Sequence, residues 1–206
     1  MKNLNRRNFI KKTSLSSAAI FSAPSLSGLD YKERDSKSNY MGDFAAPKLD
    51  TIRIAIIGVG DRGYGHAKQL ASIKGTEIVA ISDLHEDLVD RSVTACIEVG
   101  DGRHQNIARY FGDENQWEKI FKEVKLDIAI IATNWNNHAK MAIESMKQGA
   151  HAFVEVPIAV TLEEMWEIIN TSELTQKHCM MMENVNYGRE ELLYLNLCRK
   201  GVIGDL

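Results

Sequence analysis

This chain has few residues that could cross-link it or hold a metal ion. Its 206 residues include only three cysteines, far apart and without a Cys-x-x-Cys pair: Cys96, Cys179 and Cys198. This odd-numbered set argues against a disulfide framework and a zinc knuckle, so we expect free, buried thiols. His66, His138 and His151 do not fall into metal-ligand spacing either, and no metal is expected.

Long hydrophobic runs and an excess of positive charge are also lacking. No apolar run reaches the roughly 20 residues of a transmembrane helix, and 44% hydrophobic and 26% charged residues are ordinary for a soluble globular protein. Residues 1–28 contain no acid and five of the 25 lysines and arginines, so residues 29–206 carry 20 bases against 28 acids, a net charge of -8. Such an acidic body argues against a nucleic-acid partner.

The basic N-terminus has the pattern of an export signal. Asn5 to Lys11 resembles the twin-arginine motif, and a mildly apolar stretch from Leu15 to Ala23 follows it. There is no clean Ala-x-Ala cleavage site and no lipobox cysteine. We therefore predict a twin-arginine signal over residues 1–28 and a periplasmic location without a membrane anchor in the mature form; the alternative is a disordered basic N-terminus. Polar residues 29–50 are interpreted as a linker.

The stretch that organises the rest of the chain joins a strand to a helix through three glycines. The β-branched run Ile54 to Ile57 leads into Gly58, Gly60 and Gly63, and a helix is expected over residues 64–73. Gly58 permits the tight turn, Gly60 leaves room for a pyrophosphate, and Gly63 allows close packing of helix on strand. The helix N-terminus offers amide groups to the phosphates. The alternative is a purely structural turn.

An acidic residue follows the next predicted strand. Residues 77–82 form an apolar strand that places Asp83 at its carboxyl end. A carboxylate at this position accepts hydrogen bonds from the adenosine ribose hydroxyls, which favours NAD over the 2′-phosphorylated cofactor. The alternative is that Asp83 caps the helix that follows.

From residue 51 onward, predicted strands alternate with predicted helices. Further strands are expected over 107–111, 127–133, 150–156 and 179–182, and helices lie between them. This alternation predicts an α/β fold with a Rossmann-type, doubly wound parallel sheet. We place the NAD-binding domain at residues 51–157. Residues 158–206 are expected to form a helix, a strand and a helix that lead into a truncated second α+β domain.

The region after Pro157 contains a strong helix signal. Residues 161–164, Thr-Leu-Glu-Glu, form a capping box, and the helix is expected to bury a stripe of Leu162, Trp166 and Ile169. The three consecutive methionines at 180–182 are expected to pack in the core. A last helix is expected over residues 189–200, with Gly201 as its stop.

Three stretches together resemble the Gfo/Idh/MocA superfamily of NAD(P)-dependent sugar oxidoreductases. They are residues 58–63, residues 133–138 after an apolar strand, and Glu155-Val156-Pro157. Most members have Glu-Lys-Pro at the third stretch, and that lysine is their usual catalytic acid/base. Here Val156 occupies the lysine position, and a valine has no proton to give.

This departure resembles one branch, glycoside hydrolase family 109. The similar stretches are 155–156, 161–166, 182–187 and 199–205. Described members of that branch are α-N-acetylgalactosaminidases that use tightly held NAD. The resemblance makes Tyr187 a candidate active-site tyrosine, and it implies cofactor contacts at Asp61, Arg62, Asp83, Trp135, Asn136, Asn137, His138, Glu155, Val156 and Asn184.

Chain position supports these assignments in part. The segments 135–138, Glu155 and 184–187 each follow a predicted strand, and doubly wound sheets bind ligands at the carboxyl ends of their strands. The alternatives are a helix cap with surface residues for 135–138, a salt bridge for Glu155, helix capping for Asn184 and buried packing for Tyr187.

Three functions remain open from the sequence. The first is a glycosidase that uses a transient NAD hydride shuttle on a small-molecule glycoside, as an exception to the two-carboxylate scheme. The second is an NAD(P)-dependent sugar or cyclitol oxidoreductase. The third is a truncated, non-catalytic nucleotide-binding remnant, because members of the family carry a second, mostly β domain; a homo-oligomer of the full-length form stays open. We expect the isolated chain to be inactive on glycosides and to expose apolar surface near its C-terminus.

Overall fold

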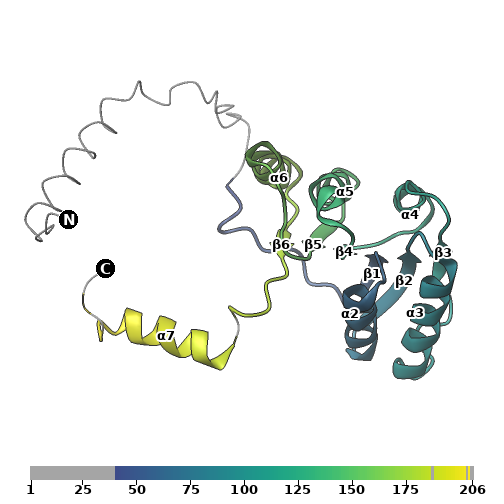
Figure 1. The fold of residues 1–206 in the computed structure, drawn as a ribbon, viewed down its shortest axis with the longest axis horizontal. Coiled ribbons are helices and arrows are strands. Elements are labelled where there is room, and N and C mark those ends of the chain that lie inside the picture. Colours follow the sequence, from purple (N-terminus) through teal and green to yellow (C-terminus); the bar gives the residue numbers. More distant parts are fainter. Residues whose placement is uncertain (1–39, 187, 203, 205–206) are drawn as a thin grey trace, which may run out of the picture. The chain divides into compact units, whose positions relative to one another are not determined.

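The computed structural model describes residues 40–186, 188–202 and 204, and within them the chain forms one parallel sheet flanked by helices (Figure 1). The sheet has six strands in the order β3-β2-β1-β4-β5-β6. The strands are β1 (Ile52–Ile57), β2 (Thr76–Ser82), β3 (Ala108–Tyr110), β4 (Ile128–Ile131), β5 (His151–Val154) and β6 (Cys179–Met181). The helices are α2 (Asp61–Ser72), α3 (Glu86–Val99), α4 (Trp117–Glu123), α5 (Trp135–Lys147), α6 (Leu162–Thr175) and α7 (Arg189–Arg199). The predicted doubly wound parallel sheet is confirmed.

Helices cover both faces of the sheet because its central strands are apolar on both sides. In β1, Ile54 and Ile56 pack into a core with residues of α2 and α3. The alternate residues Ala55 and Ile57 pack into a second core with residues of α4, α5 and α6. Successive side chains of a strand point to opposite faces, so one unbroken apolar run supplies both cores.

The strand order reverses beside β1, and this reversal creates the crevice. β1 pairs in parallel with β2 on one side and with β4 on the other. Its last residue, Ile57, lies opposite Ser82 of β2 and Ile131 of β4. The segments that follow these three strands therefore begin next to one another at the carboxyl edge, which is where doubly wound sheets bind their ligands.

Helix α6 begins as predicted but buries a different face. The Thr161 hydroxyl accepts the Glu164 N–H, and the Glu164 carboxylate accepts the Thr161 N–H, so the capping box is confirmed. The predicted buried stripe is wrong, since Leu162, Trp166 and Ile169 are each 40–45% exposed. The helix instead turns Ile168 inward, on the side where it packs against α5.

Strand β6 extends the sheet past the boundary that we placed at residue 157. It pairs in parallel with β5, so α6 and β6 continue the same sheet. Because β6 is an edge strand, Met180 and Met181 are partly exposed rather than buried as expected. The predicted signal at 1–28 and residues 29–39 of the predicted linker lie outside the described residues. Within residues 40–186, 188–202 and 204, no helix is long and apolar enough to cross a membrane.

Candidate functional site: a nucleotide cleft at the carboxyl edge

The glycine-rich turn between β1 and α2 has the geometry that its sequence predicts. Gly58 has a positive φ of 86°, and a Cβ there would lie 2.6 Å from the Ala132 carbonyl oxygen. A Cβ on Gly63 would overlap the Gly58 carbonyl oxygen, so close packing of α2 on the turn requires glycine. A Cβ on Gly60 would meet nothing within 4 Å. The turn is tight where it must be and open at the residue predicted to face a pyrophosphate.

A cleft of about 550 Å³ opens over this turn, and several predicted residues meet in it. It is bounded by the segments after β1, β2 and β4, the three strands on either side of the order reversal. Helix α2 begins directly behind the turn, at Asp61, and its N-cap residue makes no side-chain cap hydrogen bond. Helix N-termini of this kind offer amide donors to a phosphate. The predicted residues that line the cleft are Gly58, Gly60, Asp83, Asn136 and Asn137.

Asp83 binds the glycine-rich turn as well as lining the cleft. Its Oδ2 accepts the Val59 N–H at 2.7 Å, and its Oδ1 accepts the N–H of His85, the N-cap residue of α3, at 3.2 Å. Asp83 therefore lines the cleft but does not cap α3, because the N-cap residue of that helix is His85 and no side-chain cap hydrogen bond is made there. Each carboxylate oxygen has a second lone pair, which is available to a ribose hydroxyl.

In the segment after β4, two of the predicted residues line the cleft and one does not. Helix α5 begins at Trp135, and Asn136 and Asn137 in its first turn line the cleft. The Trp135 side chain is 63% exposed and does not line the cleft.

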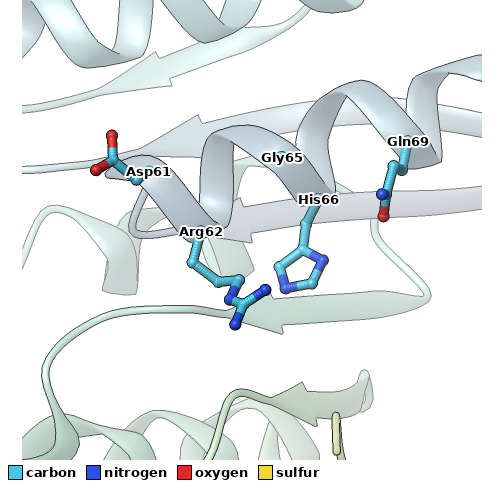
Figure 2. A pocket seen from close by; sticks show the side chains of 5 residues that line it. All are labelled: Asp61, Arg62, Gly65, His66 and Gln69. Atoms are coloured by element: carbon cyan, nitrogen blue, oxygen red, sulfur yellow. The ribbon is translucent and has the colours of Figure 1, made fainter. Parts of the chain in front are cut away.

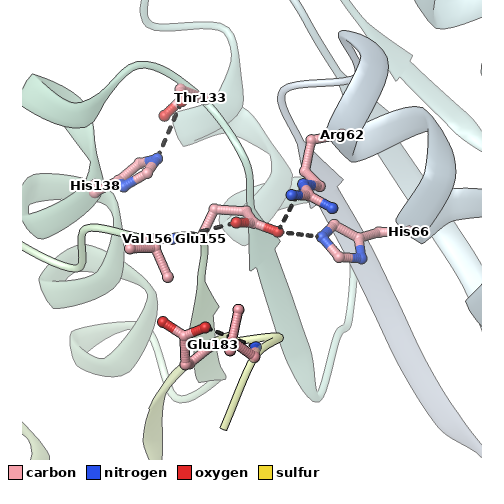
Figure 3. Close-up of polar contacts among 8 residues, drawn as sticks. Arg62, His66, Thr133, His138, Glu155, Val156 and Glu183 are labelled. Carbon is pink, nitrogen blue, oxygen red and sulfur yellow. Dashed lines mark hydrogen bonds and ion pairs between the residues drawn. The ribbon is translucent and has the colours of Figure 1, made fainter. Parts of the chain in front are cut away.

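His138 is buried, and both of its ring nitrogens contact the backbone. Nδ1 lies 2.7 Å from the Pro157 carbonyl oxygen. Nε2 lies 3.0 Å from the Thr133 carbonyl oxygen (Figure 3). In this arrangement the ring joins the segment after β4 to the segment after β5. Its polar atoms are turned to the chain rather than to the cleft.

Glu155 follows β5 and is held by side chains of α2. Its Oε1 lies 2.6 Å from His66 Nε2 and 3.5 Å from Arg62 Nε, while its Oε2 accepts the N–H of Val156 at 3.2 Å (Figure 3). The salt-bridge alternative therefore describes its contacts in this structure. Val156, the residue after Glu155, is an exposed apolar side chain.

A smaller hollow of about 320 Å³ lies along α2. Figure 2 shows the Arg62 and His66 side chains extending from the same side of the helix, whereas Asp61 extends to the other. The two residues are four positions apart, so they are neighbours on one helix face. No role was assigned to His66 from the sequence. Its four-residue spacing from Arg62 was the available signal, but its partner, Glu155, lies 89 residues away in the chain.

The remaining predicted residues lie after β6. Asn184 is exposed in the segment that follows the strand and does not line the cleft. Tyr187, the candidate catalytic residue, lies outside the described residues. In the part of the chain that the structure describes, no group of three or more histidine, cysteine or acidic side chains is arranged to hold a metal ion.

Comparison with known proteins connects this geometry to a family. The family model described as "Oxidoreductase family, NAD-binding Rossmann fold" (GFO_IDH_MocA) matches residues 52–183. A scyllo-inositol dehydrogenase from Lactobacillus casei, solved with bound NAD(H) and scyllo-inositol, is similar in fold, with a TM-score of 0.64 and 20% identity. The similarity covers 75% of this chain and 43% of that one.

Curated relatives are considerably closer in sequence. Glycosyl hydrolase family 109 protein 2 from Akkermansia muciniphila is 46% identical over an alignment of 217 positions, and the alignment covers 98% of this chain and 45% of the relative. An alpha-N-acetylgalactosaminidase from Shewanella oneidensis is 41% identical over an alignment of 209 positions, and the alignment covers 100% of this chain and 45% of the relative. The chain thus spans about half the length of the curated relatives that it matches.

Proposed function

Because the chain belongs to the Gfo/Idh/MocA oxidoreductase family, with its NAD-binding Rossmann fold, we propose that it is the NAD-binding part of a sugar-active glycosidase resembling the α-N-acetylgalactosaminidases. The observation that carries this proposal is Val156. The usual lysine acid/base is replaced by a side chain that cannot transfer a proton. The resemblance implies the same replacement for the family 109 branch, and the Akkermansia muciniphila relative is named as a family 109 protein.

The residues at the carboxyl edge fit a dinucleotide. The open space at Gly60 and the start of α2 suit the diphosphate, and the Asp83 carboxylate suits the adenosine ribose hydroxyls. The amides of Asn136 and Asn137 suit the polar groups of the second nucleotide half. When bound, NAD⁺ would accept a hydride from the sugar reversibly. The C–H bond next to the oxidised carbon would then be more acidic, which would allow the aglycone to leave by elimination.

Within this scheme, the chain's own residues bind the cofactor and one of them serves the proton transfers. Tyr187 is the candidate for positioning the sugar or moving a proton, because a phenol both donates and accepts. Trp135, Asn184 and His138 remain proposed as part of the cofactor surroundings. His138 would act through the two segments that its ring joins.

The test uses the gene product that contains this chain. It should purify with NAD bound, and it should cleave a chromogenic α-N-acetylgalactosaminide in D₂O without net NADH accumulation at 340 nm. Deuterium should appear at C2 of the released sugar. Net NADH formation with free sugars or cyclitols would favour the plain oxidoreductase instead. NAD binding without either reaction would favour the non-catalytic alternative.

We also propose export by the twin-arginine route. The support is the motif at Asn5 to Lys11, and the export of folded proteins by this route suits one that loads its cofactor before export. Replacing Arg6 and Arg7 together by lysine should retain the protein in the cytoplasm. Unchanged periplasmic accumulation of the double variant would contradict the proposal.

A further inference from the structure

Two side chains of α2 converge on one oxygen of Glu155. His66 Nε2 lies 2.6 Å from Oε1, and Arg62 Nε lies 3.5 Å from the same atom. The Glu155 side chain is only 15% exposed and that of His66 21%, whereas Arg62 is 61% exposed. The histidine contact is therefore the shorter and the better shielded of the two, and Figure 3 shows the imidazole directed at the carboxylate.

This contact ties together two segments that are not adjacent in the sheet. His66 belongs to the helix that leaves β1, whereas Glu155 follows β5, and β4 lies between those strands. The contact therefore spans the end of β4 at the carboxyl edge. Asp83 lies on the opposite side of β1, at the end of β2.

These positions assign Glu155 to one half of a dinucleotide. A dinucleotide lies across the order reversal, with its diphosphate at the first turn. If Asp83 marks the adenosine ribose, the second ribose lies on the β4 and β5 side, where Glu155 is. An ionised carboxylate accepts hydrogen bonds only, so it suits the hydroxyls of that ribose, provided that its orientation is fixed.

We propose that His66 is a positioning residue, which holds the Glu155 carboxylate in the orientation that binds the second ribose of the dinucleotide. Nε2 donates to Oε1, and the Val156 N–H donates to Oε2, so both oxygens are oriented by donors, and Oε2 keeps a further lone pair for the ligand. The proposal rests on the cofactor-binding part of the proposed function, and it is independent of which reaction the enzyme performs.

The test compares two nucleotides that differ in that ribose alone, ADP and ADP-ribose. His66→Leu removes the donor at similar size and should weaken binding of ADP-ribose and NAD⁺ about tenfold, the effect of one lost hydrogen bond to a charged group. Binding of ADP should change less than about twofold. His66→Gln retains an N–H donor on a flexible side chain and should restore most of the affinity. Titration calorimetry on the folded proteins supplies all the dissociation constants.

A double-variant comparison locates the effect at Glu155. If His66 acts through this carboxylate, His66→Leu should have no further effect on ADP-ribose binding in a Glu155→Gln background. Equal loss of ADP and ADP-ribose binding by His66→Leu would overturn the proposal, because it would indicate general distortion of α2. Unchanged ADP-ribose binding would also overturn it. A wild-type protein that binds ADP-ribose but cleaves no glycoside would disprove only the proposed reaction.

Discussion

At the scale of single residues, Gly63 and Gly65 lie two positions apart in α2 but have opposite surroundings. A Cβ on Gly63 would overlap backbone, whereas a Cβ on Gly65 would meet nothing within 4 Å. We expect Gly63→Ala to lower the free energy of unfolding by more than about 2 kcal/mol, because backbone must move. Gly65→Ala is the matched control and should be neutral or stabilising by up to about 1 kcal/mol. Urea denaturation distinguishes them, and equal effects would contradict this packing.

Gly60 allows a test that separates folding from cofactor binding. Its φ of -59° suits alanine, and its surroundings are open in the chain itself. Gly60→Ala should therefore change the free energy of unfolding by less than about 1 kcal/mol. If a diphosphate approaches this backbone, the added methyl group should weaken NAD⁺ binding at least about tenfold. Undiminished NAD⁺ affinity would show that the diphosphate lies elsewhere.

Two titrating residues near the amino ends of the strands predict a loss of stability in acid. Hydrogen bonds from Arg53 hold the pKa of Asp127 below its ordinary value of 3.8, and burial lowers the pKa of His151 below 6.5. In both cases the unfolded chain binds protons more readily than the folded one, so stability falls as the pH falls. The His151 contribution is present above about pH 6.5 and decreases below it. The Asp127 contribution is present above about pH 4 and decreases below that.

Urea midpoints measured between pH 7.5 and 3 check this prediction. They should decline in two ranges, first below about pH 6.5 and again below about pH 4. Asp127→Asn should remove the lower decline and should cost about 1–2 kcal/mol at pH 7, because the Arg53 guanidinium loses its charged partner. A variant with an unchanged acid profile would contradict the assignment to Asp127.

Residue roles that depend on local chemistry were predictable from the sequence, and roles that depend on distant partners were not. The tasks of Gly58 and Gly63 follow from the turn itself and agree with the geometry. His138 was predicted to offer a polar group to the cofactor, but in this structure its two ring nitrogens contact the carbonyl oxygens of Pro157 and Thr133. The carbonyl of Pro157 lies 19 residues away, and no local pattern indicates such a contact.

At the scale of elements, the start of α6 is set by its capping box. The Thr161 hydroxyl accepts the Glu164 N–H at 3.2 Å, and the site is exposed. Thr161→Ala should lower the free energy of unfolding by about 1 kcal/mol, since an N–H at the helix start loses its partner. Thr161→Ser keeps the hydroxyl and should recover most of that loss. Equal destabilisation by both substitutions would indicate that the methyl group, rather than the hydrogen bond, matters.

The same helix shows where element-level prediction ends. A capping box is complete within four residues, so the sequence was sufficient to place the start of α6. Its buried face depends on the neighbours against which the helix packs. Apolar residues occur around much of α6, and their spacing identified Leu162, Trp166 and Ile169, whereas the side against α5 buries Ile168. Periodicity alone does not select between two apolar faces.

At the scale of the whole molecule, alternation of strands and helices predicted the parallel sheet but not its extent. Neighbouring parallel strands need a crossover connection between them. The alternation of strands and helices from residue 51 onward is therefore compatible with few other folds. Residues 179–182 were predicted to be a strand. Their pairing with β5, however, joins two segments that are separated in the sequence by helix α6. That long-range pairing is why the predicted boundary at residue 157 falls inside the sheet.

The apolar surface expected near the C-terminus is present on α7, where Leu192, Leu193 and Leu195 are 44–52% exposed. Helix α6 exposes apolar side chains as well, and two adjacent residues of α6 test their contribution. Ile169 is 45% exposed, whereas Ile168 is 5% exposed. Ile169→Lys should leave the free energy of unfolding within about 0.5 kcal/mol of wild type, and it should reduce dye binding and concentration-dependent association of the chain. Ile168→Lys places a charge in the core and should prevent stable folding. The opposite ranking of the two variants in urea denaturation would mean that α6 buries the stripe predicted from its sequence, and that its packing against α5 is rotated.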